Sequence, residues 1–232
     1  MAIAFVAEAH SSAQATGSSV VVSKPTGTLD GHLVLVLCAN FAVHGYTAPD
    51  GSWTKLSFTD PEYADAVSIT AFAKIADSEG ASWTFTQSTE AWYSWAAFAY
   101  SGVDTAAPID VYSTAAPYVT EDTTVRAASV TVTAANCLAV WLGSWINDVG
   151  GESAGDPSGF AERLDYQGTN HSVWVGDKTF GAGATGNVDL TVTSATTMKD
   201  ACMVALKPAA DAPEAPTINA YQSGSNIIVA WS

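Results

Sequence analysis

One pattern occurs twice along this chain, and it restricts the available folds more than any other feature does. Each occurrence begins with an apolar run, Leu33–Leu37 in the first and Leu138–Leu142 in the second. Each continues through a Pro-x-Gly turn into a strand in which a basic residue and a leucine fall at the same offsets, within Pro49–Leu56 and Pro157–Leu164. Self-similarity at a long period marks a structural unit that is present more than once. We therefore expect two copies of one unit.

The segments between turns have the composition of β-strands and show no helical periodicity. Alternating apolar residues, β-branched and aromatic side chains, and punctuation by Gly, Pro and Asp predict these strands. They cover residues 3–9, 18–23, 31–41, 53–58, 67–76, 82–88, 91–102, 129–133, 136–146, 160–166, 171–180, 187–194 and 200–207. Residues 31–41 are apolar on both sides, which predicts a strand covered on both faces of its sheet. Residues 109–117 are expected to form an irregular bridge.

These elements predict an all-β fold, namely a jelly-roll-type β-sandwich with internal pseudo-twofold duplication over residues 1–207. The copies span about 20–103 and 129–207. The sequence leaves open whether they form one sandwich or two abutting ones. The next segment, 208–216, is rich in Pro and Ala and predicts an extended linker. The last segment, 217–232, reads as a strand, a Gly-Ser-Asn turn and a second strand.

The charge of the chain excludes two classes of partner. The 232 residues include 23 acidic and 8 basic side chains, a formal net charge of −15. Such a field repels phosphate backbones and anionic lipid surfaces, so we expect neither a nucleic acid nor a membrane as partner. The first residues lack the basic segment and the long apolar run of a signal peptide. A chain made in the cytoplasm, yet composed like an exported β protein, is typical of a virion component; a missing export signal is the alternative.

Residues with catalytic chemistry are scattered along the sequence. His10, His32, His44 and His171 include no pair at metal-ligand spacing. Neither a Gly-x-Ser-x-Gly elbow nor a Gly-rich phosphate loop occurs. We therefore expect no catalytic residues.

The three cysteines also favour a structural interpretation. Cys38, Cys137 and Cys202 are odd in number and lie within apolar strand patterns. Free cysteine is among the most buried residue types. The pattern predicts three buried thiols and no disulfide framework.

Acidic residues form three local groups. A glycosidase needs two carboxyl groups at a defined separation. The two groups closest to that description read as solvated loop charges: Asp60, Glu62 and Asp65, and Glu121 with Asp122. Calcium prefers several oxygen ligands, and a Gly-rich loop supplies one candidate set: Asp148, Glu152 and Asp156. Because this spacing matches no calcium-binding loop, we expect no cofactor, with Ca²⁺ as the only candidate.

Aromatic side chains give the strongest functional signal. On one aromatic-rich strand, Tyr93 and Trp95 point to one face and Trp92 to the other. In the second copy, Trp141 and Trp145 share one strand face. Core packing is the first interpretation for each ring. Rings that stay exposed are candidates for a protein interface, where Trp and Tyr are enriched, or for stacking on sugar faces.

Several segments of the first copy resemble a known module. They are Pro49–Thr54, Ala73–Ala76, Ser82–Thr86, Tyr100–Asp104 and Pro108–Asp110. The module is a β-sandwich found in minor tail and other structural proteins of actinobacterial phages, and in some secreted actinobacterial proteins. The resemblance covers most of residues 20–110, and the second copy is less similar. Members commonly carry appended fibronectin type III-like domains, and residues 217–232 resemble the first two strands of such a domain.

This resemblance implies a structural component of a bacteriophage virion, most of all an accessory (minor) tail protein. It would act through protein–protein contacts and host-surface adhesion, without catalytic residues. We expect other virion proteins and further copies of the chain as partners, in a trimer or a higher ring, because virion parts are symmetric. Two alternatives stay open: a capsid decoration protein and a carbohydrate-binding module for host cell-wall glycans. A glycosidase is the weakest alternative, and we expect the chain not to be an enzyme.

Overall fold

The computed structural model describes residues 1–41, 45–58, 67–114, 121–146, 154–169, 171–196, 198–210, 218–223 and 226–231. Over these residues the fold is all-β and contains no helix, as predicted. The described part of the chain thus holds no helix long and apolar enough to cross a membrane.

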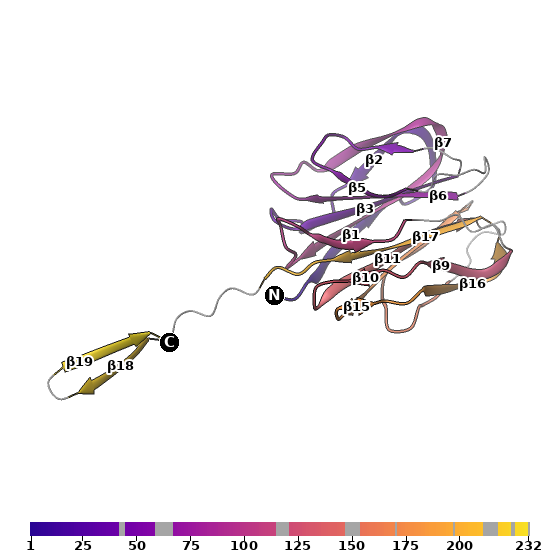
Figure 1. Ribbon diagram of the computed structural model, residues 1–232. Helices are drawn as coiled ribbons and strands as arrows, with labels where there is room; N and C mark the ends of the chain where they lie inside the picture. Colours follow the sequence, from indigo (N-terminus) through magenta and orange to yellow (C-terminus); the bar gives the residue numbers. More distant parts are fainter. Residues whose placement is uncertain are drawn as a thin grey trace.

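The strands fall into two halves and a C-terminal hairpin (Figure 1). The first half contains β1 (Ala4–His10), β2 (Ala15–Ser23), β3 (Leu33–Phe41), β4 (Tyr46–Thr47), β5 (Thr54–Phe58), β6 (Val67–Ile75) and β7 (Ser82–Ser101). The second half contains β8 (Ile109–Tyr112), β9 (Asp122–Ala127), β10 (Thr131–Val132), β11 (Cys137–Ile146), β12 (Ala154–Gly155), β13 (Ala161–Gln167), β14 (His171–Phe180), β15 (Gly183–Ala184), β16 (Val188–Thr196) and β17 (Lys199–Leu206). The hairpin consists of β18 (Ile218–Ser223) and β19 (Asn226–Trp231).

Strand pairing repeats between the two halves. The first half has a central sheet in the order β1-β7-β3-β6-β5, and the second half has the order β8-β17-β11-β14-β13. Outside these sheets, β2 and β4 pair with the beginning of β7, and β9 and β12 pair with β16. The single long strand β7 therefore occupies the positions that the two strands β16 and β17 occupy in the second half. All pairs are antiparallel.

The residue register repeats as well. Leu33 pairs with Tyr100, which also pairs with Phe5; in the second half, Leu138 pairs with Leu206, which also pairs with Ile109. Each central sheet carries two register shifts, at equivalent places in the two halves. The extra residues are Val6 in β1 and Asp110 in β8, and Leu56 in β5 and Arg163 in β13. β-bulges of this kind are designed features rather than defects, so their repetition marks the two halves as copies of one unit.

Three sequence expectations need correction. Ile109–Tyr112 is not part of an irregular bridge but the edge strand β8. The segments expected as separate strands at 82–88 and 91–102 are continuous in β7. The repeated pairing begins at β1 and β8, upstream of residues 20 and 129.

The halves form two sandwiches that abut face to face. One core lies between the two central sheets, where Leu33, Leu35 and Leu37 of β3 meet Val140 and Leu142 of β11. A second core lies on the outer face of the first central sheet, beneath β2, β4 and the beginning of β7. A third lies on the outer face of the second central sheet, beneath β9 and β16. Figure 1 shows the first half above the second. Consequently β3 and β11 are buried on both faces, as expected for β3.

The outer core of the second half depends on two Trp-x-Gly pairs. A Cβ on Gly143 would lie 2.4 Å from the Trp141 ring, and a Cβ on Gly176 would lie 2.2 Å from the Trp174 ring. Each ring therefore lies against the glycine two residues further along the same strand face. The two rings meet edge to face, with centroids 5.3 Å apart.

The chain leaves the sandwich later than the predicted linker begins. Pro208 forms a β-bridge with Val103, and the Ala209 amide donates to the carbonyl of Gly102. Residues 211–216 of the predicted linker lie outside the described residues. The two strands expected within residues 217–232 are present and pair antiparallel as β18 and β19. The cysteines follow expectation too, since all three are buried and free.

Candidate functional site

The two halves meet along two lateral seams, one at each side of the stacked central sheets. At one seam the edge strands β1 and β13 face each other, and at the other β5 and β8 do. We call the first the sealed seam and the second the open seam. Residues at equivalent register positions differ in chemistry between them. The sealed seam has Phe5, Tyr100, Arg163 and Asp177 where the open seam has Ile109, Leu206, Leu56 and Ala73.

The sealed seam is closed by an ion pair, the Tyr100 hydroxyl and the Phe5 ring. Arg163 donates two hydrogen bonds to Asp177, at 2.7 and 2.8 Å, and the Tyr100 hydroxyl donates to the same carboxylate at 3.3 Å. The guanidinium lies 4.5 Å from the centroid of the Phe5 ring. Burial, reinforced by the charge of Asp177, raises the pKa of Tyr100 well above its usual value. The carboxylate also raises the pKa of Arg163.

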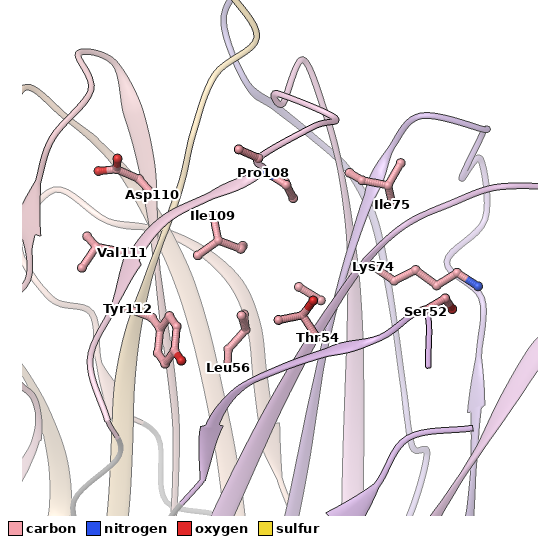
Figure 2. Close-up of a pocket in the computed structure, with 12 residues that line it drawn as sticks. Ser52, Thr54, Leu56, Lys74, Ile75, Pro108, Ile109, Asp110, Val111 and Tyr112 are labelled. Carbon is pink, nitrogen blue, oxygen red and sulfur yellow. The ribbon is translucent and has the colours of Figure 1, made fainter. Parts of the chain in front are cut away.

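The open seam contains a groove of about 660 Å³. It is lined by Ser52, Thr54, Leu56, Ala73, Lys74, Ile75, Ala107, Pro108, Ile109, Asp110, Val111 and Tyr112. In Figure 2, Ile109 and Tyr112 of β8 lie beside Leu56 and Thr54 of β5. Six of the lining residues are consecutive, 107–112, so the groove follows β8 along its length. Tyr112 stands at its rim with 43% of its surface exposed.

Both charged residues of the groove already have partners. The Lys74 ammonium lies 2.6 Å from the Glu79 carboxylate, and Glu79 also accepts a hydrogen bond from the Trp83 indole. The Asp110 carboxylate accepts from the backbone amide and the hydroxyl of Thr133. These hydrogen bonds lower the pKa of Asp110, although its partial burial opposes them. The interior of the groove is thus left to aliphatic side chains.

A polar cluster lies buried between the halves, at one end of the central core. His171 shares hydrogen bonds of 2.6 Å with Ser94, through Nε2, and with Gln14, through Nδ1. Nearby in the same interface, the carboxylate of Asp200 accepts from the amide of Ile69, across the two halves. Burial lowers the pKa of His171 to about 4 and raises the pKa of Asp200 well above its usual value.

The contact between Ser94 and His171 does not activate the serine hydroxyl as a nucleophile. Ser94 is 1% exposed and His171 is fully buried, so a substrate has no access to either. A neutral histidine with a depressed pKa is also a poor proton acceptor at neutral pH. The contacts instead link Gln14 and Ser94 of the first half to His171 of the second. They stabilise the interface between the sandwiches.

A second depression, of about 480 Å³, contains one of the predicted aromatic residues. It is lined by Ser12, Ala13, Gln14, Trp92, Tyr166, Gln167, Gly168 and Thr169. Trp92 is 46% exposed and therefore presents its indole to solvent. Gly168 is required for this shape, because a Cβ there would lie 2.4 Å from the His171 carbonyl oxygen and 2.9 Å from the Gln14 side chain.

The other predicted aromatic residues do not share this surface. Trp141 and Trp145 are fully buried in the outer core of the second half, so neither offers a ring to a partner or a glycan. Tyr93 and Trp95 are half-buried against the outer core of the first half. Of the five rings, Trp92 alone is exposed.

Sequence reasoning missed Arg163, Asp177 and His171, and one signal could have found two of them. His171 and Asp177 sit at the two ends of one strand face that is otherwise apolar, through Val173 and Val175. A titratable residue on an apolar strand face indicates a buried partner, because an unpaired buried charge is costly.

The predicted acidic groups fall largely outside the described residues. Asp60, Glu62, Asp65, Asp148 and Glu152 are not among them. Asp156 is described and exposed. Within the described residues, no cluster of three or more His, Cys, Asp and Glu side chains could hold a metal ion.

The groove of the open seam and the Trp92 depression are each formed by residues from both halves, so neither exists in a single sandwich. No protein-family model, no curated protein and no solved structure matches this chain.

Proposed function

We propose that this chain is a structural component of a bacteriophage virion, and that the preferred assignment is an accessory tail protein. It works through protein–protein contacts and not as an enzyme. One observation carries the proposal. Two sets of buried polar contacts, Tyr100–Asp177 and Ser94–His171–Gln14, join one sandwich to the other. Side chains with catalytic potential are thus buried in contacts that stabilise the duplicated unit, and partners can be recognised only by its surface.

The resemblance of the first copy to phage tail modules supports the same proposal. A further copy of the chain is a partner in this account, since symmetric virion parts form closed rings such as a trimer or a higher ring. The hairpin β18–β19 would begin an appended fibronectin type III-like domain.

An antibody raised against the recombinant chain tests the proposal. Phage particles from the culture in which the gene for this chain occurs are purified on a density gradient. The antibody is then located on the particles by immunogold labelling and electron microscopy. The proposal predicts label at one fixed place on each particle. Label that stays with soluble protein or with bacterial cells would refute it.

Copy number separates the tail role from the alternative of a capsid decoration protein. A stained gel of the same particles compares the band of this chain with that of the major capsid protein. An accessory tail protein gives a faint band, and a decoration protein gives a band of comparable intensity.

The Trp92 depression favours a second candidate function, binding of host cell-wall glycan. An exposed indole offers an apolar face for a sugar ring, and the amides of Gln14 and Gln167 line the same hollow. Co-sedimentation with host cell-wall polysaccharide measures the binding. Trp92→Ala should abolish it, and Tyr112→Ala, which removes an exposed ring elsewhere, should leave it intact. Equal binding by both variants would exclude the Trp92 site.

A further inference from the structure

We propose that the groove of the open seam is the docking site for an extended, apolar peptide segment of a partner protein, which pairs with the edge of β8. The proposal rests on the proposed assembly function and specifies the chemistry of its partner. The segment would lie along residues 107–112 and insert alternate side chains between the two central sheets.

The backbone of the edge strands is available for such pairing. β5 and β8 are the outermost described strands of their sheets, on the same side of the molecule. The edge of a sheet presents a row of unpaired amides and carbonyls, which templates the addition of a further strand. Because side chains alternate along a strand, an added segment places every second residue toward the seam.

The comparison between the seams indicates which side chains fit. In the sealed seam the space is filled by the Phe5 ring and the Arg163 guanidinium. The equivalent residues of the open seam, Ile109 and Leu56, are smaller. The groove therefore occupies the volume that larger side chains fill in the sister seam.

The charges that line the groove indicate whether the bound segment carries apolar or charged side chains. Asp177, which receives Arg163 in the sealed seam, is replaced by Ala73 in the open seam. Lys74 and Asp110 are held by Glu79 and Thr133. A charged side chain inserted here would lose its water without gaining a partner. An aromatic or aliphatic side chain is thus what the groove selects.

A displayed library of random 12-residue peptides, panned on the purified full chain, tests the proposal. We expect enriched peptides with apolar residues at alternate positions and at least one aromatic residue. Their affinity, measured by fluorescence anisotropy, should fall at least tenfold in Thr54→Arg, which places a bulky cation at the exposed rim. Ala73→Leu, which fills the floor, should have the same effect. Val21→Arg, at a residue 53% exposed on β2, is the matched control and should bind as the wild type does.

Backbone methylation tests the pairing itself. If the peptide adds a strand to β8, N-methylation at every second residue should abolish binding in one alternation and spare it in the other. Equal effects of both alternations would overturn strand addition.

Three further outcomes would overturn the proposal. In the first, the library yields no enriched peptide. In the second, enriched peptides bind Thr54→Arg and Ala73→Leu as tightly as they bind the wild type. In the third, the wild-type chain forms a concentration-dependent dimer that both variants abolish. The last would assign the groove to a second copy of the chain. The selection does not depend on where the chain lies in a virion, so its failure is distinguishable from failure of the virion assignment, which immunogold labelling decides.

Discussion

At the scale of single residues, burial of titratable groups between the sandwiches makes stability depend on pH. The pKa of His171 is about 4 in the folded chain, against about 6.5 when exposed. Between these values the unfolded chain binds a proton that the folded chain does not. The contribution of this residue to stability is therefore complete above pH 6.5 and is lost as pH falls toward 4.

The loss should amount to about 3 kcal/mol, from the difference in pKa. We expect urea denaturation of the wild type to show this fall in unfolding free energy between pH 7 and pH 4, in addition to the contribution of carboxyl groups. In His171→Gln, which cannot titrate, the difference between the two pH values should shrink by about that amount. An unchanged pH dependence would mean that His171 is not buried as described.

Two glycines carry a second prediction at this scale. A methyl group on Gly143 or Gly176 would overlap the ring of Trp141 or Trp174. Gly143→Ala and Gly176→Ala should each destabilise the chain by about 1–3 kcal/mol, the usual result of overpacking. Gly181→Ala is the control, since nothing lies within 4 Å of its Cβ position. Thermal denaturation that ranks all three alike would contradict this packing.

The sequence predicted individual residues unevenly. Cys38 and Cys202 were predictable as buried, because their neighbours on both sides are apolar. The exposure of Trp92 was not predictable, because it shares a strand face with Phe98 and Tyr100, which are buried. Its ring instead lines the depression formed with residues 166–169 of the second half, where it is exposed to solvent.

At the scale of elements, the two seams provide a comparison within one molecule. Removal of Asp177 leaves the Arg163 guanidinium and the Tyr100 hydroxyl without their shared acceptor. Asp177→Ala should cost about 3 kcal/mol, as expected when one partner of a buried pair is removed. The double variant Arg163→Leu/Asp177→Ala reproduces the Leu56 and Ala73 of the open seam. It should be more stable than the single variant, because apolar replacement of a buried pair is close to neutral.

A surface pair controls for geometry in this experiment. Arg126 and Asp189 form the same two-bond contact, at 2.6 and 2.7 Å, but both side chains are more than 40% exposed. Asp189→Ala should cost less than about 1 kcal/mol. A double variant at the seam no more stable than Asp177→Ala would show that the ion pair itself, and not its burial, holds the seam.

Elements that change layer or contain a bulge were the ones that sequence patterns misjudged. Within β7, Ser88, Thr89 and Glu90 are polar and exposed, which reads as a turn. The strand continues because β2 pairs with it on both sides of these residues, while the partner on its other edge changes from β4 to β3. In β8 the extra residue Asp110 interrupts the alternation of a strand only four residues long. Pairing partners distant in sequence, rather than local propensity, define both elements.

At the scale of the whole molecule, duplication was visible in the sequence, but its arrangement was not. Apolar residues on both faces of β3 and β11 suit either one large sandwich or two abutting ones. The three separate cores decide in favour of two. In the sequence, the repeated turn motif aligns Lys55 with Arg163. The strand pairing instead places Leu56 at the position equivalent to Arg163. The first copy has one more residue between Gly51 and Thr54 than the second has between Gly159 and Ala161, which accounts for the shift.

This arrangement explains how one chain obtains two different surfaces from one repeated unit. Equivalent edges meet at both seams, and substitution at four register positions seals one and leaves a groove in the other. The central claim is that this groove receives a partner within a larger assembly.

Cryo-electron microscopy of intact phage particles that contain this chain tests that claim most directly. The account predicts a four-layered β density at the tail, with an additional strand from a neighbouring protein along β8, in the groove beside Leu56 and Ile109. A map in which the groove is empty and faces solvent, while the chain contacts its neighbours through other surfaces, would contradict it.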